Sequence, residues 1–218
     1  MANLRQGIYG NYYGSYFSES EPLSTAEMQT NAFYIYSYLS GAGWTDNAIA
    51  GILGNMQAES SLNPGRWQSE NVGNYSGGYG LVQWTPATNY TDWCNSKGYA
   101  DPSEMDNNLN RIIYELEHGL QWIATVDYPL SFADFTKSTL SPSILASAFL
   151  KNYERAGVEV ESTRQQNANN WYTFLTGLEP GDPIEPEQPT AKKKHKYNFI
   201  LFNRQRKVYQ NGIKRNYR

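Results

Sequence analysis

Cysteine and histidine are almost missing from this sequence of 218 residues, which contains only Cys94, His118 and His195. A single cysteine excludes an intrachain disulfide, and so few soft ligands exclude a structural zinc site. A cysteine nucleophile needs an electropositive setting, so we interpret Cys94 as a packed thiol. We expect neither a metal nor a cofactor.

Long apolar runs are missing as well. No run approaches the roughly 18 residues that a membrane span requires, so we expect no membrane partner. The N-terminus MANLRQGIYGNYYGSYF lacks the charged start and apolar stretch of a secretory signal. We therefore expect synthesis in a cytosol without the general export signal.

Acidic residues are absent from the last 28 residues. Residues 1–190 hold all 21 Asp and Glu but only 8 Lys and Arg, a net charge of −13, whereas residues 191–218 carry +10. Between these parts, residues 178–190 contain four prolines and four acids, a composition typical of a stiff, extended linker. The net charge of −3 thus conceals an acidic body and a basic tail.

Capping signals and apolar spacing divide the body mainly into helices. Ser24 and Glu27 form a capping box, and Leu23 with Met28 forms a hydrophobic staple. Helices are predicted at 24–41, 45–60, 86–97, 103–124, 141–156 and 161–176, with a small β-hairpin or loop in the glycine-rich segment 66–85.

The predicted fold class is α+β, mainly α. Its parts are an irregular N-terminal arm (1–22), a main helical domain (23–177), a Pro- and acid-rich linker (178–190) and a basic tail (191–218) that we interpret as an attachment segment. Within the tail, strands are predicted at 197–202 and 207–210.

Glu59 is the candidate catalytic residue. On a helix it falls about 20° from Ile52 and about 60° from Met56, at the edge of the apolar stripe. A carboxylate is rarely placed there without a partner or a task. Desolvation would favour the protonated acid, the form that donates a proton to a glycosidic oxygen. The alternative is a helix-end carboxylate bonded to backbone groups.

Three blocks bear on this choice: GNMQAESSLNP (54–64), GGYGLVQWT (77–85) and FLKNYERAG (149–157). Their order and spacing resemble the phage tail lysozyme family over about residues 25–177. The resemblance implies a lysozyme-like domain that degrades peptidoglycan, with Glu59 as general acid. It also implies a substrate groove lined by Tyr79, Gly80 and Gln83. Ala156 takes the place of the family's usual proline.

Aromatic residues flank the same glycine-rich segment. Trp67, Tyr75 and Trp84 could stack on sugar faces. Trp93, Trp122 and Trp171 are instead predicted to be core residues within helices.

A second carboxylate would be needed for two-carboxylate hydrolysis. Glu154, Glu70 and Asp92 are the candidates, with Tyr153 as a supporting residue, although Glu154 could equally pair with Arg155 or Arg164. A one-glutamate mechanism would make the enzyme a lytic transglycosylase.

Three functions remain open at this point. The chain could be a virion-borne enzyme that opens the cell wall for injection of phage DNA, located in the phage tail. It could be an endolysin whose basic tail binds the wall, or a structural tail-tip protein. We favour the first, with the tail residues 191–218 contacting other virion proteins; its FILF run suits strand pairing more than nucleic acid. Detecting the protein in purified virions would separate the first two.

Overall fold

The computed structural model describes residues 5–6, 12–14, 16–19, 21–155 and 161–177. The predicted linker, the basic tail and the two strands expected in that tail lie outside the described residues.

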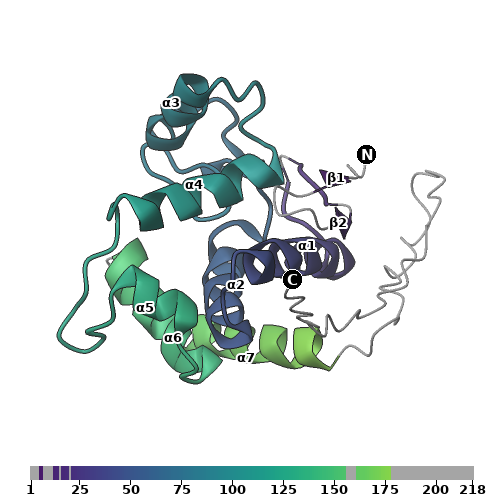
Figure 1. The fold of residues 1–218 in the computed structure, drawn as a ribbon. Helices are drawn as coiled ribbons and strands as arrows, with labels where there is room; N and C mark the ends of the chain where they lie inside the picture. The colour runs from purple at the N-terminus through teal and green to yellow at the C-terminus, as the bar shows by residue number, and fades with distance from the viewer. Residues whose placement is uncertain (1–4, 7–11, 15, 20, 156–160, 178–218) are drawn as a thin grey trace, which may run out of the picture.

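Helices account for most of the described chain, as the sequence predicted (Figure 1). The helices are α1 (Thr25–Gly41), α2 (Asp46–Ser60), α3 (Thr88–Lys97), α4 (Met105–Glu117), α5 (Phe132–Lys137), α6 (Pro142–Phe149) and α7 (Glu161–Thr176). A 3₁₀ turn, η1, spans Gln68–Glu70, and a π-helical turn, η2, follows α6 at Leu150–Glu154.

Several helix starts follow the capping residues read from the sequence. Ser24 caps α1, and its capping box with Glu27 is present. Thr45 caps α2 by accepting a hydrogen bond from the backbone N–H of Ala48. Ser141 caps α6, with Pro142 in the first turn.

The prediction of one helix over 103–124 is wrong at its C-terminal end. Helix α4 stops at Glu117 because Gly119 adopts a left-handed conformation, φ +60°. The N–H of Leu120 then donates to the carbonyl of Glu115, which is the Schellman arrangement that ends a helix. Trp122 therefore lies in a loop rather than in a helix, although it packs partly buried against the core.

The glycine-rich segment 66–85, predicted as a small β-hairpin or loop, contains two isolated bridges, Trp67 with Tyr79 and Tyr79 with Trp84. The N-terminal arm, expected to be irregular, contributes a two-stranded antiparallel ladder of β1 (Arg5–Gln6) and β2 (Tyr12–Gly14).

Helix α2 is the central element of the body. It packs against α7 and α6, and α6 packs against α7, whereas α3 and α4 lie in the upper part of the view, away from α6 and α7 (Figure 1). Ile49, Ile52, Leu53 and Met56 of α2 are fully buried, as their helical spacing predicts. The core is therefore built around the helix that carries Glu59.

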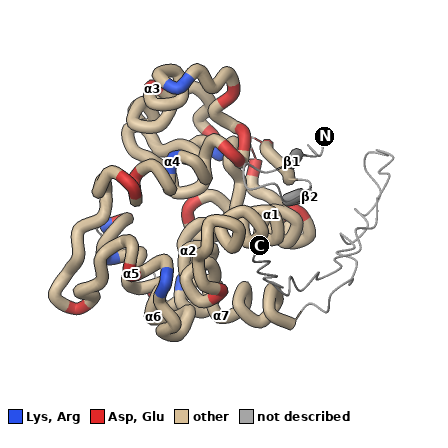
Figure 2. Tube along the Cα trace, in the orientation of Figure 1, with Lys and Arg blue, Asp and Glu red and all other residues tan. Residues whose placement is uncertain are grey.

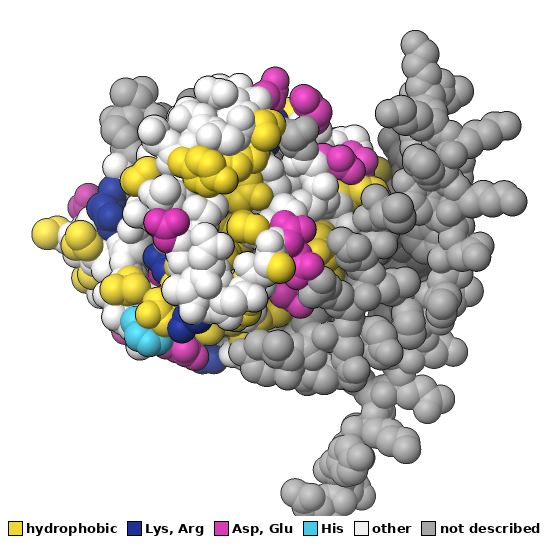
Figure 3. Space-filling model, turned by 90° about the horizontal axis from the view of Figure 1, so that it is seen from above, with side chains coloured by type: hydrophobic (Ala, Val, Ile, Leu, Met, Phe, Trp, Pro, Cys, Tyr) yellow, Lys and Arg dark blue, Asp and Glu magenta, His cyan; other side chains and the backbone are white. Residues whose placement is uncertain are grey.

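Acidic positions outnumber basic ones along the described trace (Figure 2). On the face seen from the α3 side, apolar patches stand beside Asp and Glu side chains (Figure 3). No helix among the described residues is long and apolar enough to cross a membrane.

Candidate active site

Glu59 occupies the last turn of α2, and Ser61, the first residue after the helix, adopts a left-handed conformation that ends it. The hydroxyl of Ser60 donates to the carbonyl oxygens of Met56 and Leu81, the latter at 2.9 Å. This contact fixes the glycine-rich segment against the end of α2. Glu59 is therefore held at the junction between the helical body and that segment, with 19% of its side chain exposed.

An arginine from α7 contacts this carboxylate. The Nη2 of Arg164 lies 2.5 Å from Oε1 of Glu59, and its Nη1 donates to Oδ1 of Asn55 at 3.2 Å. Arg164 is buried, so its charge needs this partner. From the sequence, Arg164 is a candidate partner of Glu154 alone, because its contact with Glu59 depends on how α7 packs on α2.

Glu154 is the second carboxyl group of this cluster. It ends the π-helical turn after α6, and its Oε1 is buried without a hydrogen-bond partner among the described residues. Burial raises the pKa of the Glu154 carboxyl well above its usual range, the nearby charge of Glu59 raises it further, and Arg164 opposes the shift. Ionisation of Glu154 is therefore disfavoured in the folded protein.

The position of Glu59 beside Ile52 and Met56 does not by itself predict an arginine partner. In the structure Glu59 faces Arg164. Glu154 interacts electrostatically with both groups, so two carboxyl groups and charges of opposite sign meet in one site.

Replacing Glu154 by glutamine should change the pH dependence of stability. The folded protein holds a proton on Glu154 that the unfolded chain releases above its ordinary pKa of 4.5, so wild-type stability falls as pH rises from there towards the folded pKa. Glutamine stays neutral throughout. We therefore expect the Glu154→Gln variant to melt above wild type at pH 7–8, with the difference disappearing near about pH 4.

Thermal melts of both proteins across this pH range measure the effect. Glu117→Gln removes an exposed acid from the end of α4 and serves as the control. Glu115, Arg155, Glu59 and Arg164 also act on Glu154 and are retained in both variants. Parallel pH profiles for wild type and Glu154→Gln would show that Glu154 is ionised in the folded protein.

The other predicted carboxylates lie elsewhere. Glu70 is exposed and forms an ion pair with Arg66, with Nη2 and Oε1 3.0 Å apart. Asp92 lies on α3, in the wall of a separate pocket. Of the three candidate second carboxylates, Glu154 is the one that interacts electrostatically with Glu59, whose charge raises the pKa of Glu154.

Tyr153 belongs to a buried network that joins α4, η2 and the glycine-rich segment. Its hydroxyl donates to Glu115, and the indole N–H of Trp84 reaches both Oε1 of Glu115 at 3.0 Å and the Tyr153 hydroxyl at 3.1 Å. Arg111 also donates to Glu115, at 2.9 Å. Trp84 is thus a buried structural residue, and Tyr153 supports the turn that carries Glu154.

Sequence reasoning missed Glu115, whose pKa is raised by burial. Its position could have been noticed in the sequence, because Glu115 follows Ile112 by three residues on the apolar face of α4. Glu59 follows Met56 on α2 at the same spacing.

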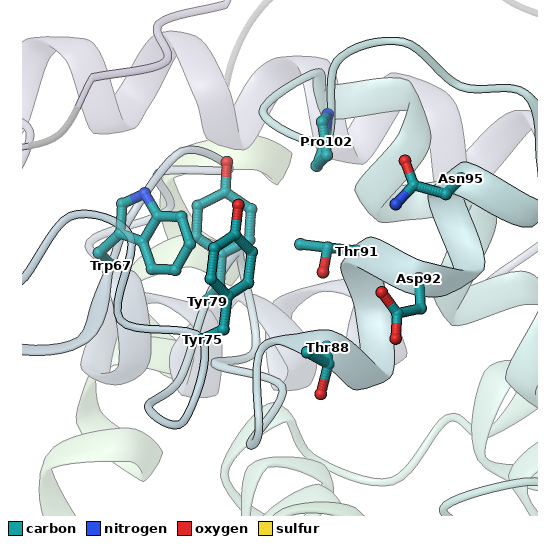
Figure 4. A pocket seen from close by; sticks show the side chains of 8 residues that line it. All are labelled: Trp67, Tyr75, Tyr79, Thr88, Thr91, Asp92, Asn95 and Pro102. Atoms are coloured by element: carbon teal, nitrogen blue, oxygen red, sulfur yellow. The ribbon is translucent and has the colours of Figure 1, made fainter.

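Gln83 and Gly80 shape the glycine-rich segment itself. The side-chain amide of Gln83 donates to the carbonyls of Arg66 and Gly80, at 3.1 and 2.9 Å. Gly80 has φ +83°, and a Cβ there would lie 2.6 Å from the side chain of Asn108, so only glycine fits. The predicted sugar-facing residues Trp67, Tyr75 and Tyr79 do come together, in the pocket that contains Asp92 (Figure 4).

Among the described residues, no group of three or more His, Cys, Asp or Glu side chains lies close enough together to hold a metal ion.

The family model for phage tail lysozymes matches residues 30–175. The chain belongs to this family. The match includes all three sequence blocks, and with them Glu59, Gln83, Glu154 and Arg164, and it ends before the linker and the basic tail.

Morphogenesis protein 1 of Bacillus phage B103 is a relative of this phage lysozyme-like protein. The two are 46% identical over 162 residues, which is 74% of this chain and 44% of the relative. The chain therefore corresponds to less than half of that relative's length.

Proposed function

We propose that this chain is a virion-associated enzyme that cleaves the glycan strand of peptidoglycan during delivery of phage DNA, with Glu59 as its general acid. The observation that carries this proposal is the cluster of Glu59, Arg164 and Glu154 at the end of α2. Family membership supports peptidoglycan as the substrate.

The cluster has the groups that acid catalysis needs. With both carboxylates ionised it would hold two negative charges against one guanidinium, so retention of one proton is favoured and the two carboxyl groups titrate as a pair. Glu59 is part-exposed, whereas Oε1 of Glu154 is buried. Glu59 is therefore the group that substrate reaches, and as general acid it must carry the proton of the pair when the glycosidic oxygen is protonated, with Glu154 ionised at that moment.

Arg164 has a separate task in this mechanism. A general acid becomes a carboxylate when it gives its proton to the leaving glycosidic oxygen. The guanidinium of Arg164, 2.5 Å from Glu59, is already in place to stabilise that charge. Because Arg164 is also bonded to Asn55, it need not move during the reaction.

Digestion of purified sacculi should yield new glycan ends between amino sugars and leave the peptide stems whole. The expected result follows from the paired carboxyl groups of the site and from the family. Mass spectrometry of the released fragments measures it. Either reducing ends, from a hydrolase, or anhydro ends, from a lytic transglycosylase, satisfy the prediction.

The opposite result has a distinct chemical signature. A peptidase would release free amino groups from the stem peptides and create no glycan ends. That outcome would contradict the proposed activity, and boiled protein provides the control for spontaneous release.

The place of action is the second part of the proposal. The name of the relative from Bacillus phage B103, a morphogenesis protein, supports association with the phage particle. We propose that the basic tail, residues 191–218, provides the contact with other tail or virion proteins, because its charge of +10 complements acidic surfaces.

A further inference from the structure

Glu115 is a buried carboxylate outside the cluster at the end of α2. It lies on the inner face of α4, and 2% of its side chain is exposed. The neighbouring residues on this face, Leu109 and Ile112, are apolar and fully buried. Burying a charge is costly unless the group is paired and hydrogen-bonded. An apolar residue would fill the same space without that cost, so the presence of a carboxylate here calls for a function.

Three donors from different parts of the fold meet the Glu115 carboxylate. Arg111, one turn earlier in α4, donates its Nε–H to Oε1 at 2.9 Å, and the indole N–H of Trp84 donates to the same oxygen at 3.0 Å. The hydroxyl of Tyr153 donates to Oε2. Burial raises the pKa of Glu115, and all three donors lower it. Because both oxygens accept hydrogen bonds, the arrangement suits the ionised form of the carboxyl group.

These contacts join the glycine-rich segment to the turn that carries Glu154. Trp84 belongs to the segment, and its indole N–H also lies 3.1 Å from the hydroxyl of Tyr153. Tyr153 is 1% exposed and directly precedes Glu154 in η2. The ring of Tyr153 stacks on that of Phe149, with the ring centres 4.4 Å apart, which restricts its movement. Glu115 is therefore a shared acceptor that fixes η2 relative to the glycine-rich segment.

Glu115 also acts on Glu154 through its charge. Burial is the largest cause of the raised pKa of Glu154, followed by the charge of Glu59. The charge of Glu115 raises this pKa further, whereas Arg164 and Arg155 oppose the rise. Because Glu59 and Glu154 titrate as a pair, an ionised Glu115 makes their shared proton harder to lose.

We propose that Glu115 is a positioning residue for the proposed cleavage: through Tyr153 it holds the turn that carries Glu154, and its charge keeps the shared proton on the carboxyl pair. The proposal rests on the proposed function, because it takes this pair as the source of the proton for the leaving glycosidic oxygen. Glu115 acts through Tyr153 and Glu154 and is not itself the proton donor.

The Glu115→Gln variant of the full chain tests the charge with little change of shape. Its amide oxygen can still accept hydrogen bonds, and its NH2 group can donate to the hydroxyl of Tyr153. Without the charge, the carboxyl pair loses its proton at a lower pH. We expect the alkaline limb of the pH–rate profile for sacculus cleavage to lie about half a pH unit below that of wild type, because Glu115 affects Glu154 less than Glu59 does.

Glu117→Gln is the matched control for the charge. It makes the same chemical change two residues further along α4, at an exposed position, and should keep the wild-type profile. An alkaline limb that stays in place in a folded Glu115→Gln protein would show that Glu115 acts by packing alone, and would overturn the proposal.

Tyr153→Phe tests the bridge to η2. It removes the hydroxyl but leaves the charge of Glu115, which Arg111 and Trp84 still bind. The rate at the pH optimum should fall several-fold, because η2 loses its bond to α4, while the alkaline limb should stay closer to wild type than in Glu115→Gln. Circular dichroism verifies that each variant is folded at the assay temperature. An unchanged rate in folded Tyr153→Phe would refute positioning through the hydroxyl, even if Glu115→Gln does not fold.

Carbon-13 NMR titration of the glutamate carboxyl groups provides a readout that does not depend on cleavage. The resonance of Glu154, assigned by its loss in Glu154→Gln, should titrate at a lower pH in Glu115→Gln than in wild type. Identical titration curves would refute the action of Glu115 on Glu154. Failure of the proposed function looks different: wild type would leave sacculi uncut, while the titration of Glu154 still responded to the change at Glu115.

Discussion

Cleavage of peptidoglycan should fall by at least about 10²-fold when Glu59 is replaced by glutamine, which is the loss expected on removing a general acid. The amide has the shape of the carboxyl group but no acidic proton. Its oxygen can still accept a hydrogen bond from Arg164, and Arg164 keeps its bond to Asn55. The rate is measured with purified sacculi, and circular dichroism verifies that the variant is folded.

Glu70→Gln is the matched control for this variant. Glu70 lies after the same sequence block as Glu59, but it is exposed and paired with Arg66. Exposed ion pairs contribute little to stability, so this variant should cleave sacculi much as wild type does. A folded Glu59→Gln protein with activity near wild type would remove Glu59 from the mechanism. A large loss in Glu70→Gln would instead place a second carboxylate outside the cluster described above.

Local chemistry explains what could be predicted from the sequence. Ser24, Thr45 and Ser141 satisfy backbone N–H groups at helix starts, and a cap acts over three residues, so it can be read without the fold. Likewise the position of Glu59 beside the apolar stripe of α2 depends on helical geometry alone. The family resemblance then led to the prediction that Glu59 is the general acid.

Elements that depend on long-range contacts escaped prediction. Helix α5 has six residues, too few for a periodic pattern to identify it. The apolar spacing of 103–124 continues through Leu120 and Ile123, yet these side chains are 40% and 61% exposed because the chain has already turned at Gly119. A period in the sequence cannot reveal where a single left-handed residue ends a helix.

The candidate site shows the same division. Glu59 could be found on its own helix, but its partner Arg164 is 105 residues away in sequence and meets it only because α7 packs on α2. The burial of Glu154, and hence its raised pKa, likewise depends on neighbours from other elements. Sequence patterns identify candidate ionisable residues, and tertiary packing determines which of them contact one another.

The close approach of α2 and α7 leads to the second large prediction, which concerns Gly54. A Cβ at this position would lie 2.5 Å from the carbonyl oxygen of Arg164 and 2.8 Å from the backbone nitrogen of Ala168. Both are backbone atoms, so relief requires movement of α7. Helix propensity alone favours Gly54→Ala by up to about 1 kcal/mol, whereas overpacking costs about 1–3 kcal/mol. We expect the clash to prevail, giving a lower melting temperature and a much reduced rate of sacculus cleavage.

Ala58→Gly provides the matched comparison on the same helix. Ala58 is exposed, so the change lowers the stability of α2 by about 1 kcal/mol through propensity alone and leaves the separation of the two helices unchanged. Both variants should melt below wild type, but only Gly54→Ala should lose activity at a temperature where it is fully folded, since a displaced α7 carries Arg164 away from Glu59. A Gly54→Ala protein that melts above wild type would show that the helices separate without cost. Equal activity in the two variants would contradict the prediction that crowding at Gly54 disturbs the site.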